Sequence, residues 1–151
     1  MKTENDLNAI FSKNLRTMWG MQDGIFHYKP NDRITDGVSD FLIWSKSETL
    51  ALENKLCKAI DVNSKAKVLG HPFSGAQITF LESQKLVGNK AYGAVYVLEH
   101  KGFYLFEHAE IPKTGNWKTD EFLDIISTKE KFITNPEGLK RMLEYVFGRL
   151  L

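Results

Sequence analysis

The sequence has little cysteine, no long apolar run and almost no net charge. Its single cysteine, Cys57, excludes an intramolecular disulfide and favours a reducing, intracellular (cytoplasmic) setting in which Cys57 packs in the core. No apolar stretch approaches the ~20 residues of a membrane-spanning helix, so we expect no membrane partner. The polar, acidic start of the chain is unlike a signal peptide. A formal net charge of +1 gives no bulk signal for nucleic-acid binding, so any basic surface must be local.

Length and composition predict one soluble globular domain over residues 1–151. The chain has 151 residues, of which 42% are hydrophobic and 26% charged, which suits a single hydrophobic core. The sequence contains no P-loop, no G-x-S-x-G turn and no paired zinc-ligand motif. An unrelated α/β enzyme would need another set of convergent polar residues, and none is evident.

Hydrophobic periodicity and turn residues predict the order of elements. The order is helix, three strands, helix, two strands and a helical tail. The expected bounds are a helix over 6–19, strands over 25–29, 40–44 and 50–55, a helix opened by Ser74, strands over 91–98 and 103–106, a short helix capped by Thr119 and a last helix from Pro136. Asn14 falls on the apolar stripe of the first helix, either as a tolerated edge residue or as a polar group facing a site.

The last helix carries an unbroken apolar stripe over residues 139–150. Such a stripe must be buried against the core or against a second subunit, and the sequence alone does not choose between them. We take it as the best available candidate for a homodimer surface.

Two acids and a lysine define the candidate site. Glu53 and Lys55 lie two residues apart in a strand and therefore share a face, and antiparallel pairing of the neighbouring strand would bring Asp40 close to Glu53. Two carboxylates bind Mg²⁺ or Mn²⁺ and leave positions for water and a phosphate oxygen, while a lysine beside them can orient or deprotonate that water. The backbone carbonyl of Asn54 is a candidate additional metal ligand. The plain alternative is an exposed, salt-bridged strand pair.

Basic and amide side chains follow this strand pair. Lys58, Lys65 and Lys67 make the segment after it locally basic, which suits either a solvated loop or contacts with a phosphate backbone. Ser74 and Gln77 have the spacing of a capping box, so Gln77 is either a helix-capping residue, a site residue, or both.

These motifs together resemble the PD-(D/E)xK nuclease superfamily. The run from Gly37 to Asp40 stands where the family commonly has a G-x-P-D turn, with Ser39 in place of proline, and the run from Glu53 to Lys55 matches E-x-K. The glutamine at the start of the following helix resembles RecU-type Holliday-junction resolvases and VRR-NUC nucleases, which are often encoded by phages. The resemblance covers about residues 5–107.

The resemblance implies a fold, a chemistry and a set of roles. It implies an α/β, restriction-endonuclease-like αβββαβ core with a mixed central sheet flanked by helices, followed by a helical extension over about 112–151. Asp40 and Glu53 would hold Mg²⁺ or Mn²⁺, Lys55 would position or activate water, and Gln77 would support Lys55 or the scissile phosphate. Members often add an acid from the first helix, whose interior here offers Asn8, Ser12 and Asn14 instead, with Glu4 and Asp6 only at its start.

The leading hypothesis is therefore a metal-dependent DNA endonuclease, with branched DNA such as Holliday junctions among its expected substrates. The alternative is a non-catalytic DNA-binding or assembly module that retains the nuclease fold. The presence of all three site residues favours the enzyme, because a non-catalytic module has no need for them. A junction resolvase is also expected to be dimeric, because it cuts two strands symmetrically.

Overall fold

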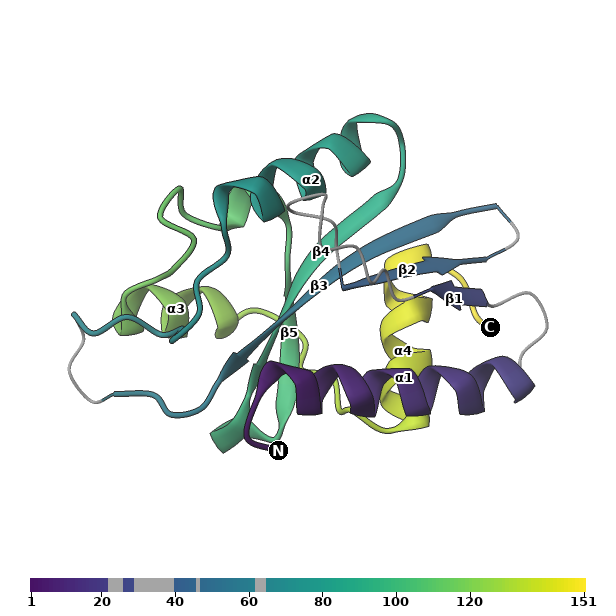
Figure 1. The fold of residues 1–151 in the computed structure, drawn as a ribbon, viewed down its shortest axis with the longest axis horizontal. Coiled ribbons are helices and arrows are strands. Elements are labelled where there is room, and N and C mark those ends of the chain that lie inside the picture. The colour runs from purple at the N-terminus through teal and green to yellow at the C-terminus, as the bar shows by residue number, and fades with distance from the viewer. Residues whose placement is uncertain (22–25, 29–39, 46, 62–64) are drawn as a thin grey trace.

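A computed structural model describes residues 1–21, 26–28, 40–45, 47–61 and 65–151, with the backbone alone at 19–21 and 26–28. Four α-helices and five strands in these residues follow the predicted order (Figure 1). In chain order they are α1 (Glu4–Met21), β1 (Phe26–Tyr28), β2 (Phe41–Trp44), β3 (Thr49–Cys57), α2 (Gly75–Leu86), β4 (Lys90–Val97), β5 (Gly102–Phe106), α3 (Thr119–Ile126) and α4 (Pro136–Phe147).

The strands form one mixed sheet in the order β1-β2-β3-β4-β5. All neighbouring strands are antiparallel except β3 and β4, which are parallel because α2 forms the crossover between them. A tight turn with Lys101 in the left-handed conformation (φ 53°) joins β4 to β5. The predicted mixed α/β fold is confirmed.

Helices cover both faces of the sheet (Figure 1). The side chains of α1 and α4 bury one face, and those of α2 and α3 pack with the segment around Trp117 on the other. Trp117 is 1% exposed and lies against the rings of Phe106 and Phe122, so this second face has an aromatic centre. Among the described residues, none of the helices combines the length and apolarity of a transmembrane segment.

The apolar stripe of α4 is buried within the chain, so its assignment as a dimer surface is wrong, and of the predicted stripe only Leu150, beyond the helix, is exposed. Leu139, Met142 and Leu143 are each 0% exposed and belong to the same cluster as the stripe of α1. Apolar burial has no directional preference, so the sequence pattern could not distinguish a subunit interface from the sheet of the same chain. Asn14 donates its side-chain amide to the backbone oxygen of Thr134, which ties α1 to the start of α4. Asn14 therefore does not face the candidate site.

Element boundaries differ from the predictions at a few points. Helix α1 begins at Glu4, two residues earlier than expected. Lys118 occupies the N-cap position of α3, and Thr119 is its first helical residue, with its hydroxyl donating to the oxygen of Ala66. The ends of the predicted first strand at 25 and 29, and the predicted turn over 37–39, lie outside the described residues.

Candidate active site

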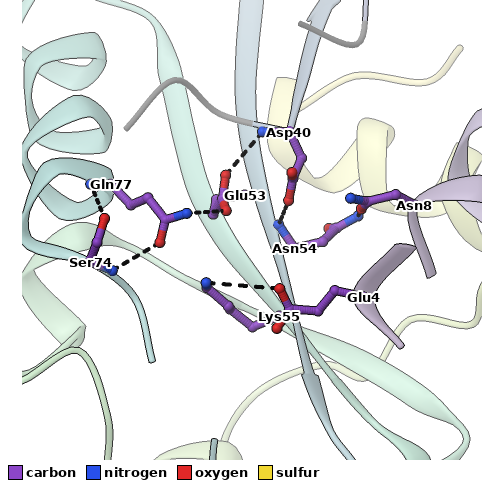
Figure 2. Close-up of polar contacts among 8 residues, drawn as sticks. All are labelled: Glu4, Asn8, Asp40, Glu53, Asn54, Lys55, Ser74 and Gln77. Carbon is purple, nitrogen blue, oxygen red and sulfur yellow. Dashed lines mark hydrogen bonds and ion pairs between the residues drawn. The ribbon is translucent and has the colours of Figure 1, made fainter. Parts of the chain in front are cut away.

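Pairing of β2 with β3 brings Asp40 and Glu53 together. The strands are antiparallel with Phe41 opposite Leu52, so Asp40, just before β2, comes level with Glu53. The backbone N–H of Asp40 donates to Oε2 of Glu53 at 3.0 Å, and the N–H of Asn54 donates to Oδ2 of Asp40 at 2.8 Å (Figure 2). The side chain of Asp40 thus takes the place of a strand partner for the backbone N–H of Asn54. The strand-end geometry therefore holds both acids in place.

Glu53 is a buried carboxylate. It is 4% exposed, and its Oε1 accepts a hydrogen bond of 2.7 Å from Nε2 of Gln77. Burial, together with the negative charge of Asp40, raises the pKa of Glu53 to about 8, although Lys55 acts in the opposite direction. Added positive charge at this pair of acids would therefore favour the ionised form of Glu53.

Lys55 lies beside the acids on the same face of β3. It is 5% exposed, and its Nζ lies 4.0 Å from Oε1 of Glu4 and 5.4 Å from the ring centroid of Phe73. A buried ammonium is costly unless it has such partners. The sheet thus delivers two carboxylates and an ammonium to one point, as the spacing of Asp40, Glu53 and Lys55 predicts.

Gln77 has two contacts at once. Its side-chain oxygen accepts from the backbone N–H of Ser74, and the hydroxyl of Ser74 accepts from the N–H of Gln77, which completes a capping box. The remaining amide N–H₂ donates to Glu53 (Figure 2). Gln77 therefore caps the helix and contacts the candidate site at the same time. The sequence predicted that it would support Lys55 or the scissile phosphate, whereas in the structure its side chain contacts Glu53.

Asn54 links the site to the first helix. Its side chain points to the opposite face from Glu53 and Lys55, where Nδ2 donates to Oδ1 of Asn8 at 2.9 Å (Figure 2). Asn54 is 0% exposed and Asn8 is 5% exposed. Through its backbone amide, Asn54 orients Asp40. Its backbone carbonyl as a metal ligand stays a prediction.

Glu4 is a site residue that sequence reasoning did not place there. It lies in the first turn of α1, and its carboxylate lies 4.0 Å from Nζ of Lys55. Burial raises the pKa of Glu4 above its ordinary value, with Asp40 adding to this and Lys55 and His71 opposing it. The signal was present, since Glu4 precedes Leu7 and Phe11 at helical spacing on the stripe that faces the sheet. The helix does supply an acid, but from its first turn and not from its interior.

A cavity of about 810 Å³ opens beside Lys55 and Glu4. Lys58, His71 and Gln77 also line it. Lys65 and Lys67 are exposed in the segment that follows, where Lys67 pairs with Lys118 in an isolated β-bridge. The site is therefore accessible to a large ligand, and of the three predicted basic residues it is Lys58 that lies at the cavity itself.

The donor atoms fit a hard divalent cation. Among the described residues, no three His, Cys, Asp or Glu side chains form a ready-made metal cluster. Mg²⁺, however, is commonly held by one or two carboxylates and keeps several waters. Asp40 and Glu53 offer two carboxylates of this kind, and a cation bound between them would offset the burial and the charge of Asp40 that raise the pKa of Glu53. These residues therefore fit Mg²⁺ or Mn²⁺.

Comparisons with known proteins agree on the fold. The sequence matches no protein-family model, and no curated protein is significantly similar to it. Among solved structures, the chain is similar to Hjc, a Holliday junction resolvase from the archaeal hyperthermophile Archaeoglobus fulgidus. The TM-score is 0.54 and the identity 16%, over 99% of this chain and 96% of that chain. The chain therefore has the restriction-endonuclease-like fold of that resolvase, whereas the likeness to RecU-type or VRR-NUC proteins in particular is not supported.

Proposed function

We propose that this protein is a metal-dependent endonuclease that hydrolyses phosphodiester bonds in branched DNA such as a four-way junction. The observation that carries the proposal is the pair of Asp40 and buried Glu53, with Lys55 beside it on the wall of an open cavity. Its fold likeness to a protein described as a Holliday junction resolvase supports branched DNA as the substrate. Such a substrate also fits the intracellular setting expected from the lone cysteine.

Each side chain has a defined role in this proposal. Asp40 and Glu53 hold Mg²⁺ or Mn²⁺ through carboxylate oxygens, with the carbonyl of Asn54 as a further donor. When bound, the cation supplies positive charge at the scissile phosphate and acidifies a water. Lys55 orients that water for in-line attack as an ammonium, or accepts its proton as a neutral amine after giving up its own. Gln77 keeps the carboxylate of Glu53 in position through the 2.7 Å hydrogen bond.

Glu4 has a supporting role in the same proposal. Its carboxylate stands 4.0 Å from Lys55, so it neutralises the ammonium in the resting site and helps to fix its position. It also provides the carboxylate from the first helix that the nuclease resemblance implies. Because Glu4 lies on the cavity wall, it is placed to contact a second cation or a water near the phosphate.

The DNA backbone is proposed to approach along the cavity and the basic segment beyond it. Lys58 lies at the cavity, and Lys65 and Lys67 are exposed further along the chain. Lysine contacts with phosphates add affinity without reading the sequence, which suits an enzyme that recognises branch structure. Two symmetric cuts require two active centres, so we propose a homodimer whose interface does not use the buried stripe of α4.

The experiment is a cleavage assay on supercoiled plasmid and on a labelled four-way junction, with Mg²⁺, Mn²⁺ or EDTA. We expect cleavage of the junction with either metal, none in EDTA, and none by Asp40→Asn. Asp124→Asn is the matched control, because Asp124 is exposed on α3. Junction binding without cleavage under every metal condition would favour the non-catalytic module, and cleavage by Asp40→Asn would refute the assigned site.

A further inference from the structure

The ring of Phe73 lies directly beneath the ammonium of Lys55. Phe73 precedes α2, is 2% exposed and belongs to the aromatic cluster on the second face of the sheet. Its ring centroid lies 5.4 Å from Nζ of Lys55. At this distance an aromatic face attracts an ammonium, and the attraction strengthens where both groups are withdrawn from water. Lys55 is itself 5% exposed, so the contact is a desolvated one.

Two glycines lie against Phe73, one against its ring and one against its backbone. Gly93 on β4 lies opposite Glu53 in the sheet, and a Cβ there would stand 2.6 Å from Cζ and 2.8 Å from Cε1 of Phe73. The ring therefore occupies the space that any other residue at 93 would fill. Gly115, with a φ of 78°, accepts the backbone N–H of Phe73 at 3.0 Å, and a Cβ there would stand 1.9 Å from the oxygen of Phe73.

The ring is also fixed from its far side. The indole of Trp117 meets it edge to face, with centroids 6.2 Å apart and an interplanar angle of 88°. Trp117 is 1% exposed and donates its Nε1–H to the oxygen of Glu110. Phe73 is thus a rigid surface between two packed backbones and an anchored indole, one residue before the cap of α2.

We propose that Phe73 is the positioning residue for Lys55, and that its ring keeps the ammonium at the place from which it acts on the attacking water. Four rotatable bonds separate the ammonium from β3, so the strand alone does not fix it. The carboxylate of Glu4, whose Oε1 lies 4.0 Å from Nζ of Lys55, is also at the end of a flexible side chain. Gln77 contacts Glu53, so the aromatic ring supplies the rigid contact. This inference rests on the proposed nuclease function.

Phe73→Leu is the decisive variant and Phe122→Leu its matched control. Both remove a buried ring from the same cluster, but only Phe73 faces Lys55. Under metal-saturated conditions we expect Phe73→Leu to lower kcat on a four-way junction roughly 10- to 100-fold, with KM unchanged, because misplacement of a reacting group by about 1 Å has such an effect. Phe122→Leu is expected to lower thermal stability similarly and to leave kcat near the wild-type value. Equal kcat values for the two variants would overturn the proposal.

NMR spectroscopy tests the contact between Lys55 and the ring of Phe73 independently of catalysis. In protein with isotope-labelled lysine, the Hε protons of Lys55, assigned with Lys55→Arg, should resonate upfield because of the ring current of Phe73. We expect this displacement to vanish in Phe73→Leu and to persist in Phe122→Leu. Gly93→Ala, which displaces the ring without removing it, should reduce it as well and serves if Phe73→Leu does not fold. A Lys55 signal without ring-current displacement in the wild type would overturn the inference, whereas a displaced signal in a protein that cleaves no DNA would refute the proposed function alone.

Discussion

Strand β3 has two faces of opposite character. On one face, Leu50, Leu52 and Leu56 are packed against α1 and α4, and each is at most 5% exposed. On the other face, Glu53 and Lys55 are equally buried but ionisable, and Lys55 lines an open cavity. The alternation of a single strand therefore separates an apolar wall from a charged site.

The difference shows how the fold accommodates a costly site. Burial, together with the charge of Asp40, raises the pKa of Glu53 to about 8. Ionisation of Glu53 is therefore less favourable in the folded protein than in the unfolded chain. The opposite face offsets this cost through apolar burial by the stripes of α1 and α4. Changes to the apolar face should therefore alter stability, and changes to the charged face should alter chemistry.

The largest expected effect is on the charged face, in Lys55→Met. Removal of the ammonium from the site should lower kcat on a four-way junction by about 10²- to 10⁴-fold, the usual contribution of a positioned acid–base group. Lys58→Met is the control, because Lys58 lines the same cavity but is exposed, whereas Lys55 is buried. It should raise KM and leave kcat unchanged. Single-turnover cleavage rates measure both, and equal losses of kcat would remove the distinction between Lys55 and its neighbours.

On the apolar face, Leu143→Ala should lower the free energy of unfolding by about 2–5 kcal/mol, because it leaves a cavity in a packed core. Leu143 is 0% exposed on α4, whereas Leu123 on α3 is 40% exposed and provides the control as Leu123→Ala. Denaturant titration measures the free energies. The cleavage rate per folded molecule should stay at the wild-type value, and a selective loss of activity would show that α4 acts on the site.

The pH dependence of stability probes the charge on Glu53. Its pKa is raised in the folded protein, from an ordinary 4.5 to about 8, so its favourable contribution is present at low pH and is lost as the pH rises through this range. Glu53→Gln does not titrate. Without metal it should therefore gain roughly 2–4 kcal/mol relative to wild type between pH 5 and pH 8.

Thermal unfolding at the two pH values, with and without Mg²⁺, measures this effect. Mg²⁺ should stabilise the wild type more at pH 8 than at pH 5, since the cation favours the ionised acids. Glu82→Gln is the control, because Glu82 is exposed on α2. If the stability of Glu53→Gln depended on pH in the same way as that of the wild type, Glu53 would not be a buried carboxylate with a raised pKa.

The smallest expected effect separates the two roles of Gln77. Ser74→Ala removes the cap of α2 and should reduce stability by about 1 kcal/mol. Gln77→Ala removes the cap partner and also the contact with Glu53, so it should further lower the cleavage rate about 10- to 100-fold, as expected for a group that orients a metal ligand. Matched stability with unequal activity is the predicted outcome. Equal cleavage rates for the two variants would show that Gln77 acts only as a helix-capping residue and would contradict its proposed role at Glu53.

Regular periodicity explains which features were predictable. Alternation in β3 places Glu53 and Lys55 on one face, and antiparallel pairing with β2 adds Asp40. The capping box at Ser74 follows from the spacing of two residues. Strand alternation and capping-box spacing are both set by residues only a few positions apart in the sequence, so they can be read without knowledge of the tertiary structure.

Features that depend on tertiary packing escaped prediction. Glu4 lies a turn before the first apolar residue of its helix, so it looked like an N-terminal charge until α1 was placed across β3. The partner of the stripe on α4 depends on which apolar surface is nearest in space. Phe73 lies between elements, where no periodicity applies, and its role follows only from its contacts with Gly93 and Lys55.

The most direct test of the central claim is the fate of a labelled four-way junction mixed with the unmodified protein in Mg²⁺. We predict paired cuts at symmetric positions in opposing strands, abolished by EDTA and by Glu53→Gln but retained by Glu82→Gln. A junction that is bound and remains intact in both Mg²⁺ and Mn²⁺ would contradict it.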